Sequence, residues 1–407
     1  MKHLTLLIAT LLISFGAMAQ NYEYDFASVC SSGQTLYYKI LSSNPPQAEV
    51  VLGVALEEGG DLIIPEMAAD TTNTFRLYEV ISIADKAFEH FNTFSEKAGI
   101  LVIPNTVLTI GEKSFHSSAF TNISLSESLV SVGDYAFYSV YELTGSLVIP
   151  QTVTSIGKHA FHACSISGCG FTGPLVIPYS VTSIGEKAFY GCGFTSLDWQ
   201  AQLTEIPESC FYECQFSGTL TLPEGLTKIG KEAFAQCTSL TGLELPSTLN
   251  NIGNLAFGMC SGLTSIEIEA LMPPYSPTTV FSFVDWDIPV HVPYGSKPLY
   301  EDNNAWRNFT NIIDDLDAVE ELENEGFEIY PNPATNAFRV TANDVEGQQA
   351  VLSVYNLVGQ RMMMQKSTVN GRMVQFDVAE TLPSGLYLIV LQTEETIRTG
   401  KLILNSH

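Results

Sequence analysis

One short segment recurs along most of this chain, and it constrains the fold more than any other feature. In TVTSIGKHAFHAC and GLTKIGKEAFAQC an apolar run is followed by glycine, by an Ala-Phe pair and, three residues later, by cysteine. Eight phenylalanines share this register, at spacings of 27, 22, 24, 28, 22, 23 and 23 residues: Phe88, Phe115, Phe137, Phe161, Phe189, Phe211, Phe234 and Phe257. One such segment buries too little surface to fold alone, whereas stacked copies share a continuous core. The repeat therefore predicts a solenoid.

A second signature precedes most of the phenylalanines: LVIP at 101, 147 and 175, LTLP at 220 and LELP at 243. Two apolar residues separated by one outward residue indicate a short strand, and proline ends it because it cannot donate to a ladder. We expect the V-T-x-I run to return along the other side of the coil and the glycine to turn the corner. Ala-Phe then lies in about one helical turn, with the phenylalanine in the centre. The predicted fold is mainly β, with parallel strands and short helical turns.

The full pattern L-x-I-P-x-x-V-T-x-I-G-x-x-A-F-x-x-C resembles the BspA-type (treponemal) leucine-rich repeat family of bacterial surface proteins. The resemblance implies a leucine-rich repeat solenoid over residues 62–268, with an N-terminal cap region at 20–61 and a C-terminal cap at 269–313. Caps are needed because an open end would expose core and strand edges. IPESCF at 206–211 departs from the pattern, so we expect a slightly irregular coil there.

The chain changes character after the repeats. Residues 314–326, DDLDAVEELENEG, indicate an acidic linker, because they lack the alternating ligands, central glycine and terminal glutamate of a calcium loop. Residues 327–407 contain seven short apolar or alternating runs separated by turn residues. Seven strands in so short a segment predict a small Ig-like β-sandwich.

Four motifs in this segment resemble the C-terminal sorting domain of type IX secretion in Bacteroidota: YPNPA at 330–334, VYNLVGQ at 354–360, LPSGLY at 382–387 and KLIL at 401–404. The resemblance implies export by the type IX secretion machinery, removal of the domain, and either attachment to surface lipopolysaccharide or release. The residues that carry the sorting motifs are Tyr330, Pro331, Asn332, Pro333, Gly385, Tyr387 and Lys401.

The first residues have the organisation of a secretory signal peptide. Lys2 precedes an apolar run, and small residues at 17–19 predict cleavage between Ala19 and Gln20, which assigns residues 1–19 to the signal. The apolar run is too short to cross a bilayer as a helix, and no later run is long enough, so no transmembrane segment is expected in the mature chain. We therefore expect a secreted or cell-surface protein on the exterior of the outer membrane.

The net charge indicates which classes of partner the protein can bind, and the cysteine spacing indicates the state of its thiols. The net charge is −26 at pH 7, and residues 20–326 carry 11 Lys/Arg against 37 Asp/Glu. Nucleic acid and anionic membranes are therefore not expected as partners, because both are bound through cations. Five of the eight cysteines follow a repeat phenylalanine by three residues: Cys164, Cys192, Cys214, Cys237 and Cys260. Their shared register predicts a column of small, buried, free thiols, although stacked neighbours would also lie within disulfide reach.

Motifs of catalysis are absent: no hydrolase, metalloprotease or nucleotide-binding pattern occurs in the sequence. His159, His162 and Cys164 could be combined into a metal site, but the cysteine belongs to the inward column whereas the histidines are expected to face solvent. We therefore expect a protein that is not an enzyme, without catalytic residues, cofactor or metal.

The outward position between the two apolar residues of each strand is the candidate binding face. These side chains are expected to line the inner surface of the solenoid, which such folds commonly use for binding. The row passes from valines to acids and is represented by Val148, Val176, Asp198, Thr221 and Glu244. Valines also simply suit strands, and acids also aid solubility. We expect an adhesin-like protein that binds a host, partner-cell or matrix macromolecule; the alternative is a structural cell-envelope protein without a dedicated ligand.

Overall fold

The computed structural model divides into two compact units, Met1–Ala318 and Val319–His407. It describes residues 23–54, 59–72, 75–91, 98–140, 142–163, 170–316, 327–330, 332–334, 337–342, 349–356, 361–368, 373–377, 382–392 and 397–404. Most of the acidic linker lies outside the described residues, as do four residues with predicted roles: Ala19, Gln20, Cys164 and Pro331.

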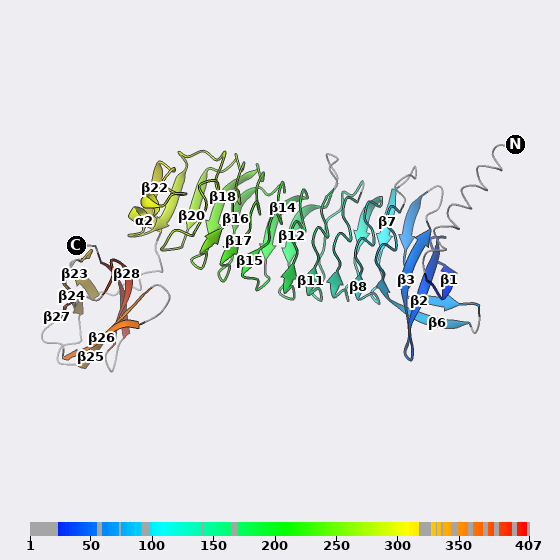
Figure 1. The fold of residues 1–407 in the computed structure, drawn as a ribbon, viewed down its shortest axis with the longest axis horizontal. Helices are drawn as coiled ribbons and strands as arrows, with labels where there is room; N and C mark the ends of the chain where they lie inside the picture. The colour runs from blue at the N-terminus through cyan, green and yellow to red at the C-terminus, as the bar shows by residue number, and fades with distance from the viewer. Residues whose placement is uncertain are drawn as a thin grey trace. The chain divides into compact units, whose positions relative to one another are not determined.

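The first unit is a solenoid of stacked coils, which follow one another in chain order along its length (Figure 1). One side carries the longer parallel strands, in three ladders: β4-β7-β9, β12-β14 and β16-β18-β20-β21-β22. Their bounds are β4 Gly60–Ile63, β7 Ala98–Val102, β9 Phe120–Ser124, β12 Thr172–Ile177, β14 Gly193–Trp199, β16 Gly218–Thr221, β18 Leu240–Leu245, β20 Ser265–Ile268, β21 Pro289–Pro293 and β22 Asn311–Leu316. We call the outward surface of these strands the long-strand face.

The returning V-T-x-I runs form parallel strands of two residues each on the other side of the coils. Their bounds are β8 Thr109–Ile110, β10 Ser131–Val132, β11 Ser155–Ile156, β13 Ser183–Ile184, β15 Glu205–Ile206, β17 Lys228–Ile229 and β19 Asn251–Ile252. In each pair the isoleucine or valine lies opposite its equivalent in the next coil, for example Ile156 opposite Ile184. The alternation of the sequence thus sets the register of the stack.

Both ends of the solenoid are closed by other elements. At the N-terminal end, β1 (Phe26–Val29), β2 (Thr35–Ser43) and β3 (Pro46–Val54) pair antiparallel. They continue into the stack through β6 (Arg76–Ile83), which also pairs β5 (Met67–Asp70). At the other end the short helix α2 (Lys297–Asp302) places the buried Tyr300 so that its hydroxyl donates to the Ala270 carbonyl at 2.6 Å. These elements cover the open core as the sequence required.

A column of phenylalanine rings forms the centre of the solenoid. All eight predicted phenylalanines are buried, and neighbouring rings stack nearly parallel with centroids 5.1–5.6 Å apart. The column continues to Phe281, 5.8 Å from Phe257, although its segment TTVFS lacks the Ile-Gly-x-x-Ala pattern. Phe281 then meets Trp306 and Phe309 edge-on. The aromatic core thus extends one coil beyond the eight phenylalanines aligned from sequence.

The turn around each phenylalanine is locked to the next coil by backbone hydrogen bonds. Phe161 N–H, for example, donates to Ala188 O at 2.8 Å, and Phe189 N–H donates to Cys210 O at 3.0 Å. The residue two before the phenylalanine has a positive φ in eight successive turns, as at His159 with φ 53°. We call this outer edge of the coils the turn edge.

The cysteine column is free and buried where the structure describes it. Four thiols of the column are unpaired: Cys192, Cys214, Cys237 and Cys260. Each donates to the backbone carbonyl of the repeat phenylalanine in the preceding coil, at 3.1–3.3 Å. This confirms the predicted column for these four residues. Burial raises the pKa of Cys192 and of Cys260 to about 12, so these thiols are un-ionised and inert near neutral pH. Cys30 and Cys210 are buried free thiols as well.

The expected irregular coil at 206–211 interrupts the short-strand side, where β13 and β15 do not pair. In regular coils the glycine N–H donates to the preceding coil, as Gly185 does to Ile156 O at 2.9 Å. Pro207 occupies the glycine position and has no N–H to donate. The long-strand side is also interrupted there, between β14 and β16. The expected irregularity is confirmed, and on the short-strand side Pro207 cannot supply the hydrogen bond that glycine donates in the other coils.

The second unit contains seven strands among its described residues, in two antiparallel sheets ordered β23-β24-β27 and β26-β25-β28-β29. Their bounds are β23 Phe327–Tyr330, β24 Ala337–Ala342, β25 Gln349–Tyr355, β26 Arg361–Thr368, β27 Met373–Asp377, β28 Gly385–Gln392 and β29 Ile397–Leu404. Inward residues of both sheets share one core, among them Phe338, Leu352, Ile389 and Leu402. The prediction of a small β-sandwich is confirmed.

Candidate binding surface

The outward positions of the long strands form one row because the strands pair in register. Val176 lies opposite Asp198 in β12 and β14, and Thr221 lies opposite Glu244, which lies opposite Glu267. The same register continues to His291 and Ile313 in the last two strands. The side chains before and after most of these outward residues are buried, while Leu197 beside Asp198 is half-buried, so the row points away from the core.

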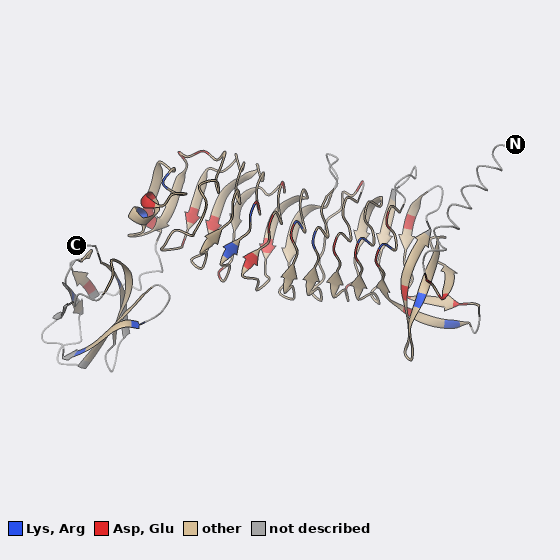
Figure 2. Cartoon of the chain, viewed as in Figure 1, with Lys and Arg blue, Asp and Glu red and all other residues tan. Residues whose placement is uncertain are grey.

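The chemistry of this row changes along the solenoid. Val148 is 75% exposed and Val176 is 37% exposed, which are high values for apolar side chains. From Asp198 onward the row becomes acidic, and Figure 2 shows Asp and Glu on the strands towards the C-terminal end of the solenoid. Val148 itself lies in a coil joined to the next one only by the bridge between Ser146 and Thr172.

The acidic end is denser than the sequence suggested. The pKa of Glu269 is raised, first by burial and then by the neighbouring carboxylates of Glu224, Glu244 and Glu267. Thr221 donates to Glu244 Oε2 at 2.7 Å. Among the residues that the structure describes, no lysine or arginine pairs with these four acids. The sequence did not point to Glu224 and Glu269, because they lie outside the outward strand positions. Only the folding of the coils brings these two carboxylates close to the row.

The row is interrupted twice within the candidate residues. Val148 lies outside the strands, and its coil is joined to the next one only by the bridge between Ser146 and Thr172. Asp198 and Thr221 belong to separate ladders, because β14 and β16 do not pair. The turn edge still connects these coils, since Gly191 N–H donates to Tyr212 O at 2.7 Å. The structure thus places Val176 with Asp198 and Thr221 with Glu244 as two paired groups.

The turn edge carries a second ordered feature, a file of stacked imidazole and phenol rings. Each ring follows a repeat phenylalanine directly, in five successive coils: His116, Tyr138, His162, Tyr190 and Tyr212. Neighbouring ring centroids are 4.4–5.2 Å apart. Three of the four pairs are stacked, and the rings of Tyr138 and His162 are tilted by 42°. All five residues are half-buried, and so is His159, which corrects the expectation that His159 and His162 face solvent. Sequence spacing alone shows the shared register but not that the rings stack.

Burial controls the titration of these histidines. The pKa of His162 is lowered to about 4, first by burial, then by His159 and Lys187. Its Nδ1 lies 3.0 Å from His159 Nδ1, so one ring donates to the other. Both imidazoles are therefore neutral near pH 7. Cys164, which the sequence grouped with them, lies outside the described residues.

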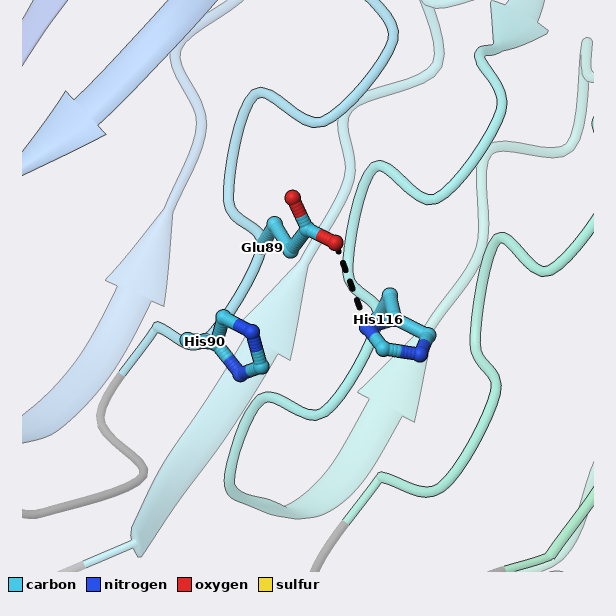
Figure 3. A group of neighbouring side chains, drawn as sticks. All are labelled: Glu89, His90 and His116. Carbon is cyan, nitrogen blue, oxygen red and sulfur yellow. Dashed lines mark ion pairs between the residues drawn. The ribbon is translucent and has the colours of Figure 1, made fainter.

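At the start of this file, Glu89 and His90 of one turn face His116 of the next (Figure 3). Each offers one ligand atom, and these atoms all lie within 4.8 Å of one another. The cluster joins residues that are 26 and 27 positions apart, which sequence reasoning did not connect. The signal was available, because His116 and Glu89 each follow a repeat phenylalanine directly and therefore occupy equivalent positions.

In the second unit, the first and last sorting motifs meet. Asn332 Nδ2 donates to Lys401 O at 2.7 Å, while Ile403 N–H donates to Asn332 Oδ1 at 2.8 Å. Tyr387 hydroxyl donates to Pro383 O at 2.7 Å within its own motif. Tyr330 and Pro333 are exposed. Gly385 begins β28, where it lies opposite Leu404.

Comparison with known families decides the identity of the repeats. Residues 71–173 and 165–276 match the BspA type leucine rich repeat region, in six copies, and together cover just over half of the chain. The chain belongs to this BspA-type family. Residues 328–405 of this BspA-type chain match the secretion system C-terminal sorting domain. The protein is therefore a secreted or cell-surface repeat protein that carries a type IX sorting domain.

One solved structure shares the fold of the BspA-type solenoid, and two others resemble it less closely. A leucine-rich repeat protein from Bacteroides ovatus is 22% identical with a TM-score of 0.51, covering 74% of this chain and 77% of that one. The T. pallidum leucine-rich repeat protein is 20% identical over 56% of this chain and 87% of that one, with a TM-score of 0.37. A leucine-rich cell surface protein from Faecalibacterium prausnitzii is 17% identical over 74% and 100%, with a TM-score of 0.30. The first similarity shows the fold. No curated protein matches the chain.

Among the described residues, the structure contains no helix that is both long and apolar enough to span a membrane.

Proposed function

We propose that this protein is an adhesin-like repeat protein that binds an extracellular macromolecule of a host, a partner cell or a matrix through its long-strand face. The supporting observation is the outward row, in which Val176 lies opposite Asp198 and Thr221 opposite Glu244, with exposed valines at one end and un-neutralised acids towards the other. Exposed apolar positions of this kind often mark contact surfaces in proteins that live in water. The extended sheet surface of a solenoid is also the surface that such folds commonly present to partners.

The proposed partner has an apolar part and a cationic part. Val148 and Val176 would contact the apolar part, while Asp198, Thr221 and Glu244 would face cationic groups. Complementary charge steers encounter and fixes the orientation of the partner along the row. The proposed activity is binding alone, without catalysis, because these side chains lie in solvent on a sheet surface rather than converging on a buried reacting centre.

We further propose that the protein works on the exterior of the outer membrane. The sorting domain match supports handling by the type IX secretion machinery. The predicted signal peptide at 1–19 would provide the earlier step across the inner membrane.

A binding screen with face variants tests the proposal. The purified protein is titrated against immobilised matrix macromolecules and against intact bacterial and host cells, at low and physiological salt. The triple variant Asp198→Lys, Glu244→Lys, Glu267→Lys should weaken binding to the ligand found by at least tenfold and flatten its salt dependence. Val148→Glu with Val176→Glu should weaken binding through the apolar part of the contact.

A matched charge control separates the face from net charge. Glu142→Lys, Glu186→Lys and Glu213→Lys change the net charge equally at exposed positions outside the long-strand row, and should leave affinity within about twofold. Unchanged affinity in both face variants would exclude this face as the binding site. If the unmodified protein binds none of the probes yet stays abundant at the cell surface, the structural envelope alternative replaces the adhesin proposal.

A further inference from the structure

The cluster of Glu89, His90 and His116 has the composition of a metal site. Two imidazoles and one carboxylate are a ligand set that zinc uses in proteins, with a fourth position left open. The three ligand atoms lie within 4.8 Å of one another. Figure 3 shows the Glu89 carboxylate and the His90 ring on one turn, beside the His116 ring of the next.

Backbone hydrogen bonds hold the two turns that carry these residues. Lys86 N–H donates to Glu112 O at 2.8 Å, Phe88 N–H to Ser114 O at 2.7 Å and His90 N–H to His116 O at 2.8 Å. Beneath them the Phe88 and Phe115 rings stack at 5.1 Å. The Cα positions of all three ligands are therefore fixed by the repeat itself, which is the rigid support that a metal site needs.

The distance between two of the ligand atoms matches the geometry of a tetrahedral ion. Glu89 Oε1 lies 3.4 Å from His116 Nδ1. Two ligand atoms that each lie about 2.0–2.1 Å from a tetrahedral zinc ion are about 3.3 Å apart. An ion can therefore sit between this oxygen and this nitrogen without moving either side chain far. The exposed His90 ring needs only a side-chain adjustment to complete the set.

His116 Nδ1 is buried and makes no hydrogen bond among the described residues, and its 3.4 Å contact with Glu89 Oε1 is an ion pair only when the imidazole is protonated. A buried nitrogen that lacks a hydrogen bond is costly, and a bound ion would satisfy it.

We propose that Glu89, His90 and His116 bind one divalent transition-metal ion of the Zn²⁺ class at the turn edge of the solenoid. Ca²⁺ and Mg²⁺ are excluded by this ligand set, because both ions require mainly oxygen donors. The three protein ligands leave one position for water or for a donor from a partner molecule. The site lies on the turn edge rather than on the long-strand face.

Zinc titration of the purified full chain tests the site. Calorimetry should show one saturable Zn²⁺ site, and Zn²⁺ should raise the thermal midpoint, because the native state alone holds the three ligands together. His116→Gln, His90→Gln and Glu89→Gln should each weaken binding by more than about tenfold, as loss of a ligand does. Ca²⁺ and Mg²⁺ should neither bind saturably nor raise the midpoint.

A matched control is available elsewhere in the same unit. His291 Nδ1 lies 2.8 Å from Asp315 Oδ1, a histidine–carboxylate pair to which the structure assigns no second imidazole within the described residues. His291→Gln should leave zinc affinity unchanged. Because His116 also stacks on Tyr138 at 5.2 Å, the near-isosteric Glu89→Gln variant separates loss of a ligand from loss of folding. Zinc affinity unchanged in Glu89→Gln or in His90→Gln, or no saturable binding by the unmodified chain, would overturn the three-ligand site.

Discussion

At the residue scale, the phenylalanine column does most to hold the coils together. Phe189 is fully buried, stacks on Phe161 and Phe211 at 5.6 Å each, and meets the edge of Phe194. Each ring therefore belongs to two interfaces at once. A defect in one ring weakens the coil that contains it and both neighbours.

Phe189→Ala should accordingly lower the free energy of unfolding by about 3–5 kcal/mol, since truncating a buried aromatic leaves a cavity. Chemical denaturation followed by circular dichroism measures the change. Tyr179→Ala is the control, because Tyr179 is a large side chain of the same coil region but is 65% exposed. An unchanged midpoint in Phe189→Ala would mean that the column does not carry the stability of the stack.

The histidines of the turn edge make stability depend on pH. His162 has a pKa of about 4 in the folded protein and about 6.5 in the unfolded chain. Between these pH values the imidazole is protonated in the unfolded state but not in the folded state. This contribution to the free energy of unfolding is therefore complete above pH 6.5 and is lost as the pH falls towards 4. Solvent reaches part of the ring, which reduces the loss to about 1–2 kcal/mol.

His162→Phe keeps a ring between Tyr138 and Tyr190 but removes the titrating group. When the pH is lowered from 7.5 to 4.5, the free energy of unfolding of the unmodified protein should therefore fall by about 1–2 kcal/mol more than that of the variant. Denaturant titrations at the two pH values measure this difference, and carboxylates contribute equally to both proteins. Equal losses in the two proteins would contradict the assignment.

At the element scale, glycine decides how closely the coils approach. A Cβ built at Gly185 would lie 2.4 Å from Lys158 N and 2.6 Å from its Cα. Such a contact is with backbone, which cannot rotate away. The close approach of the coils on this side therefore requires glycine at the corner that Gly185 occupies.

Gly185→Ala should destabilise the protein by about 1–3 kcal/mol, because the added methyl forces the backbones of two coils apart. Gly193→Ala is the milder comparison, since its nearest neighbour is the Thr172 Cγ2 methyl at 3.0 Å, on a side chain that can move. Thermal unfolding of both variants tests the difference. Equal midpoints would show that the corner tolerates a side chain and that backbone proximity is not the reason for glycine.

At the scale of the whole molecule, two units with different tasks share one chain. The BspA-type solenoid presents an extended surface, and the sorting domain closes its sandwich by joining Asn332 to the backbone of its last strand. The charge is divided in the same way, since residues 327–407 carry 6 Lys/Arg against 7 Asp/Glu while the acids concentrate before them. The sorting domain thus belongs to one unit, and the surface that we propose for binding belongs to the other.

The mature surface form should lack residues 1–19 and about 80 residues at its C-terminal end. Exposed acidic segments between compact units are favoured sites of cleavage, and the sorting family implies removal of the domain. Intact mass spectrometry of protein released from the cell surface measures both losses. Recovery of chain that extends to His407 at the surface would contradict removal of the sorting domain.

Much of this architecture could be predicted from the sequence, because the repeat places the same residue types at the same positions of every coil. The phenylalanine register, the alternation in L-x-I-P and the cysteine spacing each specify one position in every coil, so stacking brings equivalents together. The departure of IPESCF at 206–211 from the repeat pattern also predicted the irregular coil there. The seven strands of the second unit followed from their alternation and turn residues.

The sequence by itself determined what each coil contributes: which residues enter the core, which leave it, and that many coils must stack. Only the tertiary structure shows which side chains of neighbouring coils contact one another. It placed Glu89 and His90 against His116 across a coil boundary, stacked His162 on Tyr190, and gathered Glu224 and Glu269 beside the acidic row. The physical reason is that these contacts depend on the distance and angle between neighbouring coils. Both are set by the packing of the whole stack, and no single repeat encodes them.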